Sequence, residues 1–287
     1  MNGAAILTLP APAKLNLFLH ITGRRSDGYH TLESLFVLVD HGDIVSLARR
    51  EDDAIVRSQG PANVPADADL AVAAAQLLKR ECKVSSGITI GIDKRIPMGG
   101  GLGGGSSDAA TVLLGLNRLW GLGLSRAALM DFARELGADV PFFVFGRPAF
   151  ATGVGEMLTP VSLPPTCFVV LVPAVQVQTA SIFAAAELTR NSPSVRIIVF
   201  SEGYGRNDLQ AVAIARFAEI ADCLAALERA QHVAGARMTG SGGCVFAAFA
   251  TEEAAAQALS QIRRGRVMVG FLAKTLERHP LWHFAQV

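Results

Sequence analysis

Several features that would assign a chain to a specialised class of proteins are scarce in this sequence. Its 287 residues include only four cysteines, and no two of them form a Cys-x-x-Cys pair. They stand far apart, at Cys82, Cys167, Cys223 and Cys244. This spacing argues against a disulfide framework and against a cysteine zinc site, so we expect four reduced thiols in the cores.

The sequence also lacks an excess of charge and a long apolar run. Its formal net charge is +1, whereas nucleic acids and anionic membranes favour partners with a marked basic excess. No stretch reaches the roughly 18 unbroken apolar residues of a membrane span. The opening MNGAAILTLPAPAKLN has no basic segment of the signal-peptide kind. We therefore expect a cytoplasmic protein with no nucleic-acid partner and no membrane partner.

Apolar material, in contrast, is plentiful. Hydrophobic residues make up 51% of the chain and charged residues 18%, which is enough to fill substantial cores. The length indicates one large domain or two of medium size. The stretch PVSLPP at 160–165 is the best candidate boundary, and it predicts domains over residues 1–160 and 161–287.

Strand-like and helical runs are mixed along the chain. In the first half we predict strands at 15–21, 32–39, 44–47 and 87–92, and helices at 69–79, from the Ser106-Ser107-Asp108 cluster onward, and at 126–136. In the second half we predict strands at 168–172, at 244–249 and near 266–272, and helices at 209–230 and 252–262. Because strands and helices do not alternate strictly, the pattern predicts an α+β fold with two domains.

The most informative segment is the glycine-rich PMGGGLGGGSSDAA at 97–110, between a predicted strand and a predicted helix. Glycine permits positive φ and lets a ligand approach the backbone closely. Successive N–H groups ahead of a helix N-terminus form an anion site suited to phosphates. The hydroxyls of Ser106 and Ser107 could add contacts to phosphate oxygens or to Mg²⁺.

Two other interpretations of this loop fit the sequence less well. It is not a Walker A loop, because no Gly-Lys-Ser/Thr follows, and its spacing is not that of a dinucleotide-binding turn. A flexible linker would not be flanked by IDKRIPM and an apolar helix. We therefore predict that nucleotide phosphates bind here. The predicted binding residues are Pro97, Met98, Gly99, Gly100, Gly101, Leu102, Gly103, Gly104, Gly105, Ser106 and Ser107.

This segment resembles the ATP loop of the superfamily that contains galactokinase, homoserine kinase, mevalonate kinase and phosphomevalonate kinase. The form GGGLGGGSS is similar to the branch that phosphorylates the 2-hydroxyl of a cytidine diphosphate derivative of methylerythritol. The blocks PAKLNLFLHITGRRSDGYHTLESLF and MTGSGGCVFAAF also match that branch, as do LGADVPFF and ATGVGEML, in the family's order. The resemblance runs from about residue 11 to residue 281.

The resemblance implies a fold and a reaction. The N-terminal domain should be similar to domain 2 of ribosomal protein S5, and the C-terminal domain should be ferredoxin-like. ATP is the implied phosphoryl donor, with Mg²⁺, and a small alcohol is the substrate in non-mevalonate isoprenoid synthesis. The resemblance assigns no metal-binding side chains, and a monomer and a homodimer are both compatible with it.

Two residues are candidates for the chemistry. From the sequence alone, Lys14 could be an edge or snorkelling residue of an apolar strand, and Asp139 a local turn former. The resemblance implies that Lys14 lies near the reacting hydroxyl and that Asp139 is the catalytic base. It also implies that the MTGSGG turn at 238–243 approaches the phosphate loop. Cys244, directly behind this turn, is expected to be a buried small residue.

The resemblance also implies a cytosine pocket. Tyr29 would stack on the base, His30 would hydrogen-bond to it, and Phe183 would cover its other face with Thr179 nearby. Stacking suits any base, so hydrogen bonds must select cytosine. Asn16, on the same strand face as the candidate lysine, would help to hold the substrate. A packing role for Phe183, as a core aromatic at a helix, stays open.

Two other functions compete with this interpretation. Another kinase of the superfamily would act on mevalonate, homoserine or a sugar, and the Gly-Tyr-His motif argues against it. A regulator that binds nucleotide without catalysis would not need Lys14 and Asp139. The segment 189–206 and the closing TLERHPLWHF match the family poorly.

Overall fold

The computed structural model describes residues 6–195, 205–230, 235–265 and 268–286. The strands are β1 (Ile6–Arg24), β2 (His30–Arg50), β3 (Ile55–Gln59), β4 (Gly87–Asp93), β5 (Ala149–Thr152), β6 (Met157–Pro160), β7 (Cys167–Val172), β8 (Arg237–Met238), β9 (Val245–Phe249) and β10 (Val269–Leu276). The α-helices are α1 (Leu70–Glu81), α2 (Gly104–Leu119), α3 (Arg126–Leu136), α4 (Val140–Phe145), α5 (Thr179–Phe183), α6 (Gln210–Arg216), α7 (Ala218–Arg229) and α8 (Glu252–Gly265). Helices and strands are mixed as the sequence predicted, which confirms the α+β class.

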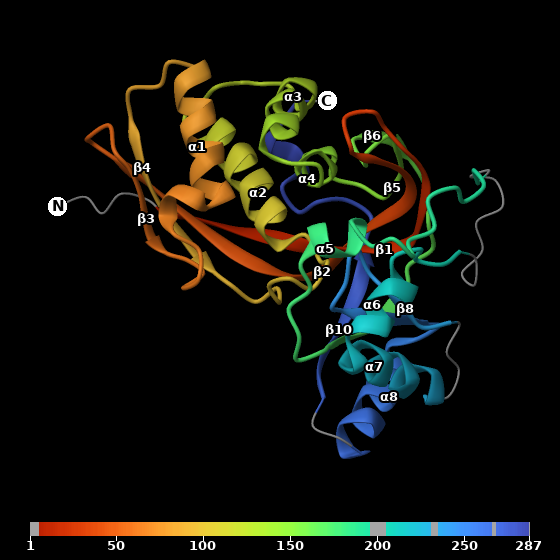
Figure 1. Cartoon of the computed structure of the whole chain (residues 1–287). Coiled ribbons are helices and arrows are strands. Elements are labelled where there is room, and N and C mark those ends of the chain that lie inside the picture. Colours follow the sequence, from red (N-terminus) through yellow and green to blue (C-terminus); the bar gives the residue numbers. More distant parts are fainter. Residues whose placement is uncertain (1–5, 196–204, 231–234, 266–267, 287) are drawn as a thin grey trace.

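The long strand β2 joins the two halves of the molecule. Along one edge it pairs with β1 for almost its whole length. Along the other edge it pairs in succession with β5 at 34–36, with β10 at 38–39 and with β4 at 44–50. Since β10 also pairs with β7, which pairs with β9, one continuous sheet passes through both halves. Figure 1 shows β1 and β2 crossing the molecule in this way.

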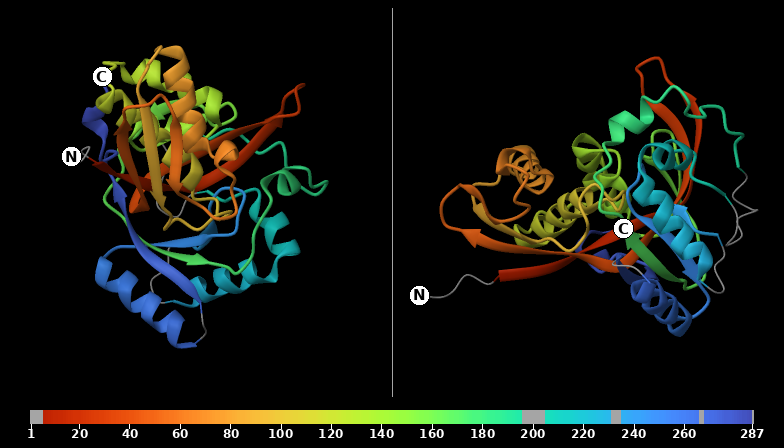
Figure 2. Two further views of the ribbon diagram at one scale, coloured as in Figure 1. Left: turned by 90° about the vertical axis from the view of Figure 1, so that its left-hand side faces the viewer. Right: turned by 60° about the horizontal axis from the view of Figure 1, so that its bottom comes forward.

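Helices cover the sheet on one side in each half. In the first half α1 to α4 lie together over the strands, as Figures 1 and 2 show, and close a core with β1, β2 and β4. In the second half α6, α7 and α8 pack on one face of β7, β9 and β10. The alternate residues Phe168 and Val170 of β7 face the other way, against Leu15 and Val37.

The predicted break in the strand at 40–43 is absent, because β2 runs without interruption from His30 to Arg50. The polar residues there find partners that are distant in the sequence. Asp40 accepts the backbone N–H of Lys274 at 2.7 Å, and His41 stacks on Phe271 with ring centroids 3.7 Å apart. Asp43 is fully buried and accepts from two backbone N–H groups of the segment after β4. Because tertiary contacts satisfy these polar groups, the strand does not need to turn there.

Most other predicted elements are present with shifted ends. Asp69 and Ser125 cap α1 and α3 with their side chains. The helix predicted from Ser106 begins earlier, at Gly104, because Gly103 takes the N-cap position with φ 72°. The helix predicted at 209–230 is two helices, α6 and α7, separated at Phe217. The predicted strand near 266–272 is seen as β10, and its residues 266 and 267 lie outside the described residues.

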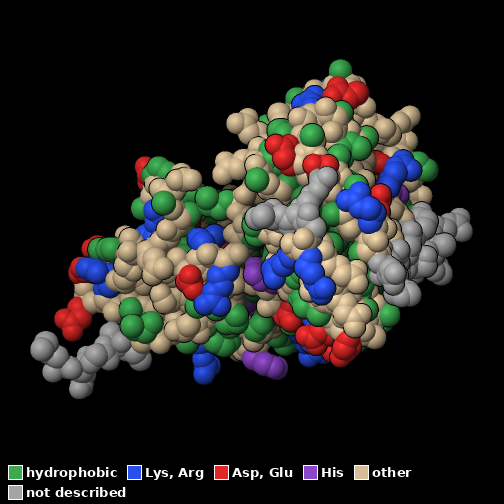
Figure 3. Space-filling model, turned by 90° about the horizontal axis from the view of Figure 1, so that it is seen from below, with side chains coloured by type: hydrophobic (Ala, Val, Ile, Leu, Met, Phe, Trp, Pro, Cys, Tyr) green, Lys and Arg blue, Asp and Glu red, His purple; other side chains and the backbone are tan. Residues whose placement is uncertain are grey.

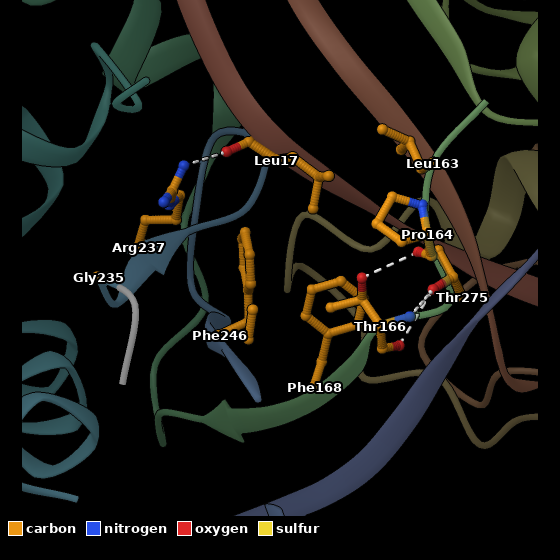
Figure 4. A pocket seen from close by; sticks show the side chains of 10 residues that line it. Leu17, Leu163, Pro164, Thr166, Phe168, Gly235, Arg237, Phe246 and Thr275 are labelled. Atoms are coloured by element: carbon orange, nitrogen blue, oxygen red, sulfur yellow. Dashed lines mark hydrogen bonds between the residues drawn. The ribbon is translucent and has the colours of Figure 1, made fainter. Parts of the chain in front are cut away.

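A small cavity marks the junction of the halves. It lies between Leu17 of β1, the linker after β6, Phe168 of β7 and Phe246 of β9 (Figure 4). The guanidinium of Arg237 closes one side and donates to the carbonyl of Leu17 at 2.6 Å. On the surface seen from below, acidic and basic side chains are interspersed (Figure 3). Among the described residues, no helix is long and apolar enough to cross a membrane.

The four cysteines are free, but only Cys223 and Cys244 are buried as predicted, whereas Cys82 and Cys167 are partly exposed. Cys244 is fully buried, and burial raises the pKa of its thiol to about 12. It therefore remains a protonated, small packing residue, which confirms the prediction made for it.

The C-terminal segment after β10 returns to the first half, so the C-terminus lies beside α3 (Figure 1). His279 donates its backbone N–H to the carbonyl of Gly146 at 2.7 Å, and Asn117 of α2 donates to the carbonyl of Phe284 at 2.9 Å. The last residues of the chain therefore pack with the first half, although they follow the second half in the sequence. The domain boundary at residue 160 stays a prediction.

The buried His279 should make this docking sensitive to pH. Burial, and then the charge of Arg126, lower the pKa of its imidazole to about 3. The unfolded chain takes up a proton below pH about 6.5, whereas the folded chain does not until about pH 3. Stability therefore falls as the pH is lowered through this window, by up to about 1.4 kcal/mol per pH unit.

His279→Asn should remove this part of the pH dependence and keep an acceptor for the N–H of Leu281. Urea unfolding of both proteins at several pH values between 7 and 4 measures the difference. His283→Asn is the matched control, because His283 lies in the same segment but is exposed. An identical pH slope in wild type and His279→Asn would contradict the assignment.

Candidate active site

A cavity of about 490 Å³ opens where β1, β2, the glycine-rich loop, the start of α4 and α5 meet. Its wall contains residues that the sequence predicted for the site but that are far apart along the chain. They are Lys14, Asn16, Asp139, Thr179, Phe183 and the loop residues Gly99, Gly101, Gly103, Gly104, Gly105 and Ser106. The structure therefore brings the predicted phosphate loop, catalytic pair and part of the base pocket into one space.

The glycine-rich loop has the conformation that its composition indicates. Gly99, Gly101 and Gly103 have φ of 69°, 75° and 72°, a region that L side chains rarely adopt. The loop leads directly into the N-terminus of α2, whose first backbone N–H groups have no partner within the helix. N–H groups in such a turn ahead of a helix form a concave site for phosphate oxygens.

Not every predicted loop residue faces the cavity. Leu102 is buried in a core formed with residues of β1, β2, β7 and β9. Ser107 is fully buried and donates its hydroxyl to the carbonyl of Pro12 at 2.6 Å, so this side chain fastens the loop to β1. Ser106 does line the cavity. Of the two hydroxyls, that of Ser106 is therefore the one placed to meet a ligand.

The turn at 238–243 packs directly against the glycine-rich loop, as the sequence analysis expected. The N–H of Cys244 donates to the carbonyl of Gly100 at 3.1 Å, and a Cβ on Gly101 would lie 2.2 Å from the carbonyl oxygen of Thr239. The turn is itself held by Asn207, whose side chain donates to the carbonyls of Met238 and Gly240 at 2.8 Å each. The second half of the chain thus packs against the glycine-rich loop and supports it.

A buried charged cluster lies beneath the loop. The ammonium of Lys94 forms ion pairs with Asp43 and, at 2.7 Å, with Asp108 of α2. Burial raises the pKa of Asp108 to about 7 although Lys94 lowers it. The other carboxylate, Asp43, accepts the N–H groups of Arg95 and Ile96. The cluster ties β2 to the strand-to-loop connection and to the helix behind the loop.

Lys14 and Asp139 face each other across the cavity wall. The ammonium of Lys14 lies 3.6 Å from the carboxylate of Asp139 and donates to Asn16 at 2.5 Å. The Lys14 side chain is buried, while that of Asp139 is 37% exposed toward the cavity. The backbone N–H of Lys14 also donates to the carbonyl of Leu102 at 3.0 Å, which fixes this strand against the glycine-rich loop.

The position of Asp139 depends on the short helix α4, which it precedes. A helix of six residues is not stable on its own. Phe142 and Phe143, both almost fully buried, hold α4 in the core of the first half. Burying one such ring contributes about 1.5–3 kcal/mol. The apolar run of LGADVPFF therefore anchors the carboxylate at the edge of the cavity.

Asn16 is the centre of a hydrogen-bond network behind the lysine. Its side-chain amide donates to Ser34 at 2.8 Å, and its backbone N–H donates to the hydroxyl of Thr239 at 2.9 Å. The amide oxygen thereby points at the ammonium of Lys14. This network fixes the lysine and links β1, β2 and the turn at 238–243.

Of the four residues predicted to bind a base, Thr179 and Phe183 line the cavity, whereas Tyr29 and His30 do not. Thr179 and Phe183 are four residues apart on α5 and both line it. The ring of His30 lies 5.2 Å from that of Phe183. Tyr29, on the loop before β2, is 65% exposed and does not line the cavity. Phe183 also packs against the core of the second half, which confirms the packing role that the sequence left open.

Several residues that shape this site are absent from the predicted set. They are Asp43, Lys94, Arg190 and Asn207. The only local signal was the position of Lys94 in IDKRIPM, directly before the glycine-rich loop. The others act through partners more than 25 residues away, and single-sequence patterns do not reveal such pairs.

Comparison with known proteins agrees with this geometry. The model of the GHMP kinases N terminal domain matches residues 69–147, and the model of the GHMP kinases C terminal domain matches residues 185–266. A protein of Thiobacillus denitrificans named 4-diphosphocytidyl-2-C-methyl-D-erythritol kinase is 54% identical over 275 residues, covering 96% of this chain and 97% of that protein. A protein of the same name from Nitrosospira multiformis is 52% identical and covers 100% and 97%.

Solved structures show the same relationship. A crystal structure of 4-(cytidine 5'-diphospho)-2C-methyl-D-erythritol kinase has a TM-score of 0.83 and 34% identity, covering 94% of this chain and 99% of its own. Homoserine kinase from Cytophaga hutchinsonii has a TM-score of 0.73 at 17% identity, covering 96% and 95%, and shows the shared fold.

The close approach of the two loops predicts a cost for any side chain at Gly101. Gly101→Ala combines a left-handed φ with a Cβ that has no space. Gly121→Ala is a matched control, because Gly121 has φ 67° but nothing within 4 Å of the added Cβ. The left-handed conformation alone costs about 1–2 kcal/mol, and the clash should add about 1–3 kcal/mol.

Urea unfolding and the KM for ATP measure the two consequences. Gly101→Ala should lose clearly more stability than Gly121→Ala, and only Gly101→Ala should raise the KM for ATP. Equal losses in the two variants would show that the turn at 238–243 can move away from the loop.

Proposed function

The chain belongs to the GHMP kinases and, within them, to the 4-diphosphocytidyl-2-C-methyl-D-erythritol kinases, and from this premise we propose how its residues divide the work. The reaction is the ATP-dependent phosphorylation of the 2-hydroxyl of 4-diphosphocytidyl-2-C-methyl-D-erythritol, giving the 2-phosphate. It is a step of isoprenoid precursor synthesis by the methylerythritol phosphate pathway. The proposal takes the enzyme to act in the cytoplasm as a monomer or homodimer, without a nucleic-acid partner.

One observation carries the assignment of the chemistry. Lys14 and Asp139 form an ion pair at the wall of the cavity into which the glycine-rich loop opens. Phosphoryl transfer depends mainly on in-line placement and on neutralisation of charge on the moving group. The loop would hold the ATP phosphates, and the substrate hydroxyl would lie between the loop and the ion pair.

We assign distinct tasks to the two side chains. The carboxylate of Asp139 accepts the hydrogen bond of the substrate hydroxyl and orients the oxygen toward the γ-phosphorus. It receives the proton as the new P–O bond forms and the bond from the γ-phosphorus to the bridging oxygen breaks, with ADP as the leaving group. The ammonium of Lys14, fixed by Asn16, stabilises the negative charge that gathers on the transferred group. Since Lys14 is buried, its charge acts with little screening by water.

The site also fits Mg²⁺ delivered with ATP. Mg²⁺ usually keeps several waters and takes one or two protein oxygens besides those of the phosphates. Among the described residues no group of three or more His, Cys, Asp or Glu side chains could hold a metal by itself. Ser106 and Asp139 are the oxygen donors on the wall beside the loop. Bound there, the ion would neutralise phosphate charge.

Asp139→Asn tests the role of the carboxylate. The amide keeps the shape but cannot accept the proton, so turnover should fall by at least about 100-fold. ATP affinity should hardly change, because the loop and α2 hold the phosphates. Asp131→Asn is the matched control, because that carboxylate is on the exposed face of α3 and pairs with Arg134.

Steady-state kinetics with the cytidylyl substrate and a separate ATP-binding titration measure the two effects. Near wild-type turnover of Asp139→Asn would remove Asp139 from the mechanism. A parallel loss of ATP affinity would instead indicate that the substitution disturbs the phosphate loop.

Selection of the cytosine base is proposed to rest on His30. Arg190 donates from its Nε to the Nε2 of His30 at 3.0 Å. A guanidinium can only donate, so this ring nitrogen must accept and the proton of the neutral imidazole must be on Nδ1. Burial, followed by the charges of Arg190 and Arg24, lowers the pKa of His30 and keeps the ring neutral.

A fixed Nδ1–H group distinguishes the pyrimidines. The ring N3 of cytosine is an acceptor, whereas the N3 of uracil carries a hydrogen and would meet the imidazole N–H donor to donor. The cost of an unpaired polar group makes this a strong filter. Tyr29 and Phe183 would supply the two stacking faces, which bind any base. Thr179 would support the second face, since it opens α5 and hydrogen-bonds to Ser241.

Arg190→Met tests the filter, because methionine replaces the unbranched stem of the side chain but cannot donate. His30 could then present an acceptor, and the preference for cytidylyl over uridylyl methylerythritol should fall by at least about tenfold, from a cost of about 1–3 kcal/mol per unpaired group. The pKa of His30 should also rise toward its usual value of about 6.5, so the KM should become pH-dependent there.

Arg190 also donates to the carbonyls of Phe183 and Ala185. Arg216→Met is the matched control, because Arg216 likewise holds the α5 segment, through Ser181 and Glu187, without a hydrogen bond to His30. The ratio of kcat/KM values for the two substrates is the measurement. An unchanged ratio in Arg190→Met would refute the proposed role of the Nδ1–H group.

A further inference from the structure

The C-terminal segment carries a group of cations around one aromatic ring. Trp282 has three guanidinium carbons near its ring: that of Arg126 at 4.0 Å, that of Arg278 at 5.3 Å and that of Arg147 at 5.6 Å. Arg126 begins α3, Arg147 follows α4, and Arg278 follows β10. Three separate parts of the chain therefore bring positive charge to the same place.

This charge has no counter-ion in the described part of the chain. None of the three guanidinium groups forms an ion pair there. Arg126 donates to the carbonyls of Val144 and Trp282, and its pKa is lowered first by burial and then by the charge of Arg147. The Nε groups of Arg126 and Arg147 are buried and have no hydrogen-bond acceptor. Like charges held close together repel one another, and an anion bound beside them would reduce this repulsion.

A cavity of about 530 Å³ lies beside this group, and Arg147 and Arg278 line it. Several of the other lining residues are apolar, among them Pro148, Val161 and Leu276. One carboxylate, that of Glu277, is also at the wall and is exposed to solvent. The cavity shares no lining residue with the candidate active site.

We propose that this cavity is a second binding site, for a small organic phosphate with a short apolar group. The phosphate would meet Arg147 and Arg278, whose planar guanidinium groups can each donate two hydrogen bonds to its oxygens. The stacking on Trp282 holds both groups in place before the ligand arrives, which reduces the entropy lost on binding. The apolar substituent would lie against the proline, valine and leucine side chains.

The cavity of Figure 4 differs from the cavity at Arg147 and Arg278 in size and in the state of its arginine. That cavity is smaller in accessible space and its walls are mostly apolar, and its arginine, Arg237, already donates to a backbone carbonyl. The cavity at Arg147 and Arg278 instead combines apolar walls with two cations that have no anionic partner among the described residues. The TLERHPLWHF segment, which matches the family poorly, supplies both Arg278 and Trp282.

The fluorescence of Trp282 provides a direct readout, because Trp120 is the only other tryptophan. In a full-length protein with Trp120→Phe, n-butyl phosphate should change the emission in a saturable way. The same titration with a non-hydrolysable ATP analogue at saturation should give the same curve, since the two cavities are separate. Loss of the signal under ATP analogue would place the probe in the phosphate loop and overturn the proposal.

Variants identify the residues that bind the probe. Arg278→Gln should weaken n-butyl phosphate binding by about tenfold or more, the effect of losing charge-assisted hydrogen bonds. Arg147→Gln should do the same. Arg264→Gln is the matched control, because Arg264 is exposed on α8 and contacts only Ser260 there. Arg278 is exposed, so Arg278→Gln should fold normally. If Arg147→Gln fails to fold, the affinity of Arg278→Gln alone tests the site.

Two further probes separate charge from apolar contact. Inorganic phosphate should bind more weakly than n-butyl phosphate, and n-butanol should give no saturable signal. Equal binding of n-butanol would exclude a role for the arginines, and equal binding of inorganic phosphate would exclude a role for the apolar wall. No saturable change with n-butyl phosphate, or unchanged affinity in Arg278→Gln, would overturn the site altogether.

Discussion

Two backbone hydrogen bonds hold the glycine-rich loop in place, and the geometry of the active site depends on them. One runs from the N–H of Lys14 to the carbonyl of Leu102, and the other from the N–H of Cys244 to the carbonyl of Gly100. The first comes from β1 and the second from the turn before β9. A loop so rich in glycine loses much conformational entropy when it is ordered, and these contacts from both halves offset that loss. The same contact that orders the loop places Lys14 beside it.

Charge is distributed around this loop in two different ways. Beneath it, Lys94 is paired with Asp43 and Asp108 in a buried cluster, so its charge serves to hold strands and helix together. At the cavity wall, Lys14 has a partly exposed carboxylate 3.6 Å away and is available to a ligand. A buried ion pair that loses one partner costs about 3–5 kcal/mol, so the lower cluster is a structural requirement. The upper pair is the part of the site that can do chemistry.

The two halves of the chain cannot be considered independent. Strand β2 pairs with β4 and β5 of the first half and with β10 of the second, and the segment after β10 returns to α2 and α3. The chain therefore passes between the two halves twice, once where it enters the second half after β6 and once where it leaves it after β10. Such connections oppose rigid separation of the halves and keep α5, which carries part of the proposed base pocket, at a fixed distance from the glycine-rich loop.

The sequence by itself determined the α+β class, the phosphate loop and much of the cavity wall. These features have local causes: glycines that need positive φ, Asp69 and Ser125 as helix caps, and the apolar run after Asp139 that must be buried. Lys14, Asn16, Thr179 and Phe183, which were assigned through the family resemblance, also lie on that wall.

Only the tertiary structure decided the continuity of β2, the tautomer of His30 and the position of the turn at 238–243. Each rests on a pair of residues that are distant in the sequence: Asp43 with the segment after β4, Arg190 with His30, and Asn207 with the carbonyls of the turn. A polar residue in a sequence shows that it needs a hydrogen-bond partner but does not show which one. That choice is made when the chain packs, because the cost of burying an unpaired polar group then selects among the partners within reach.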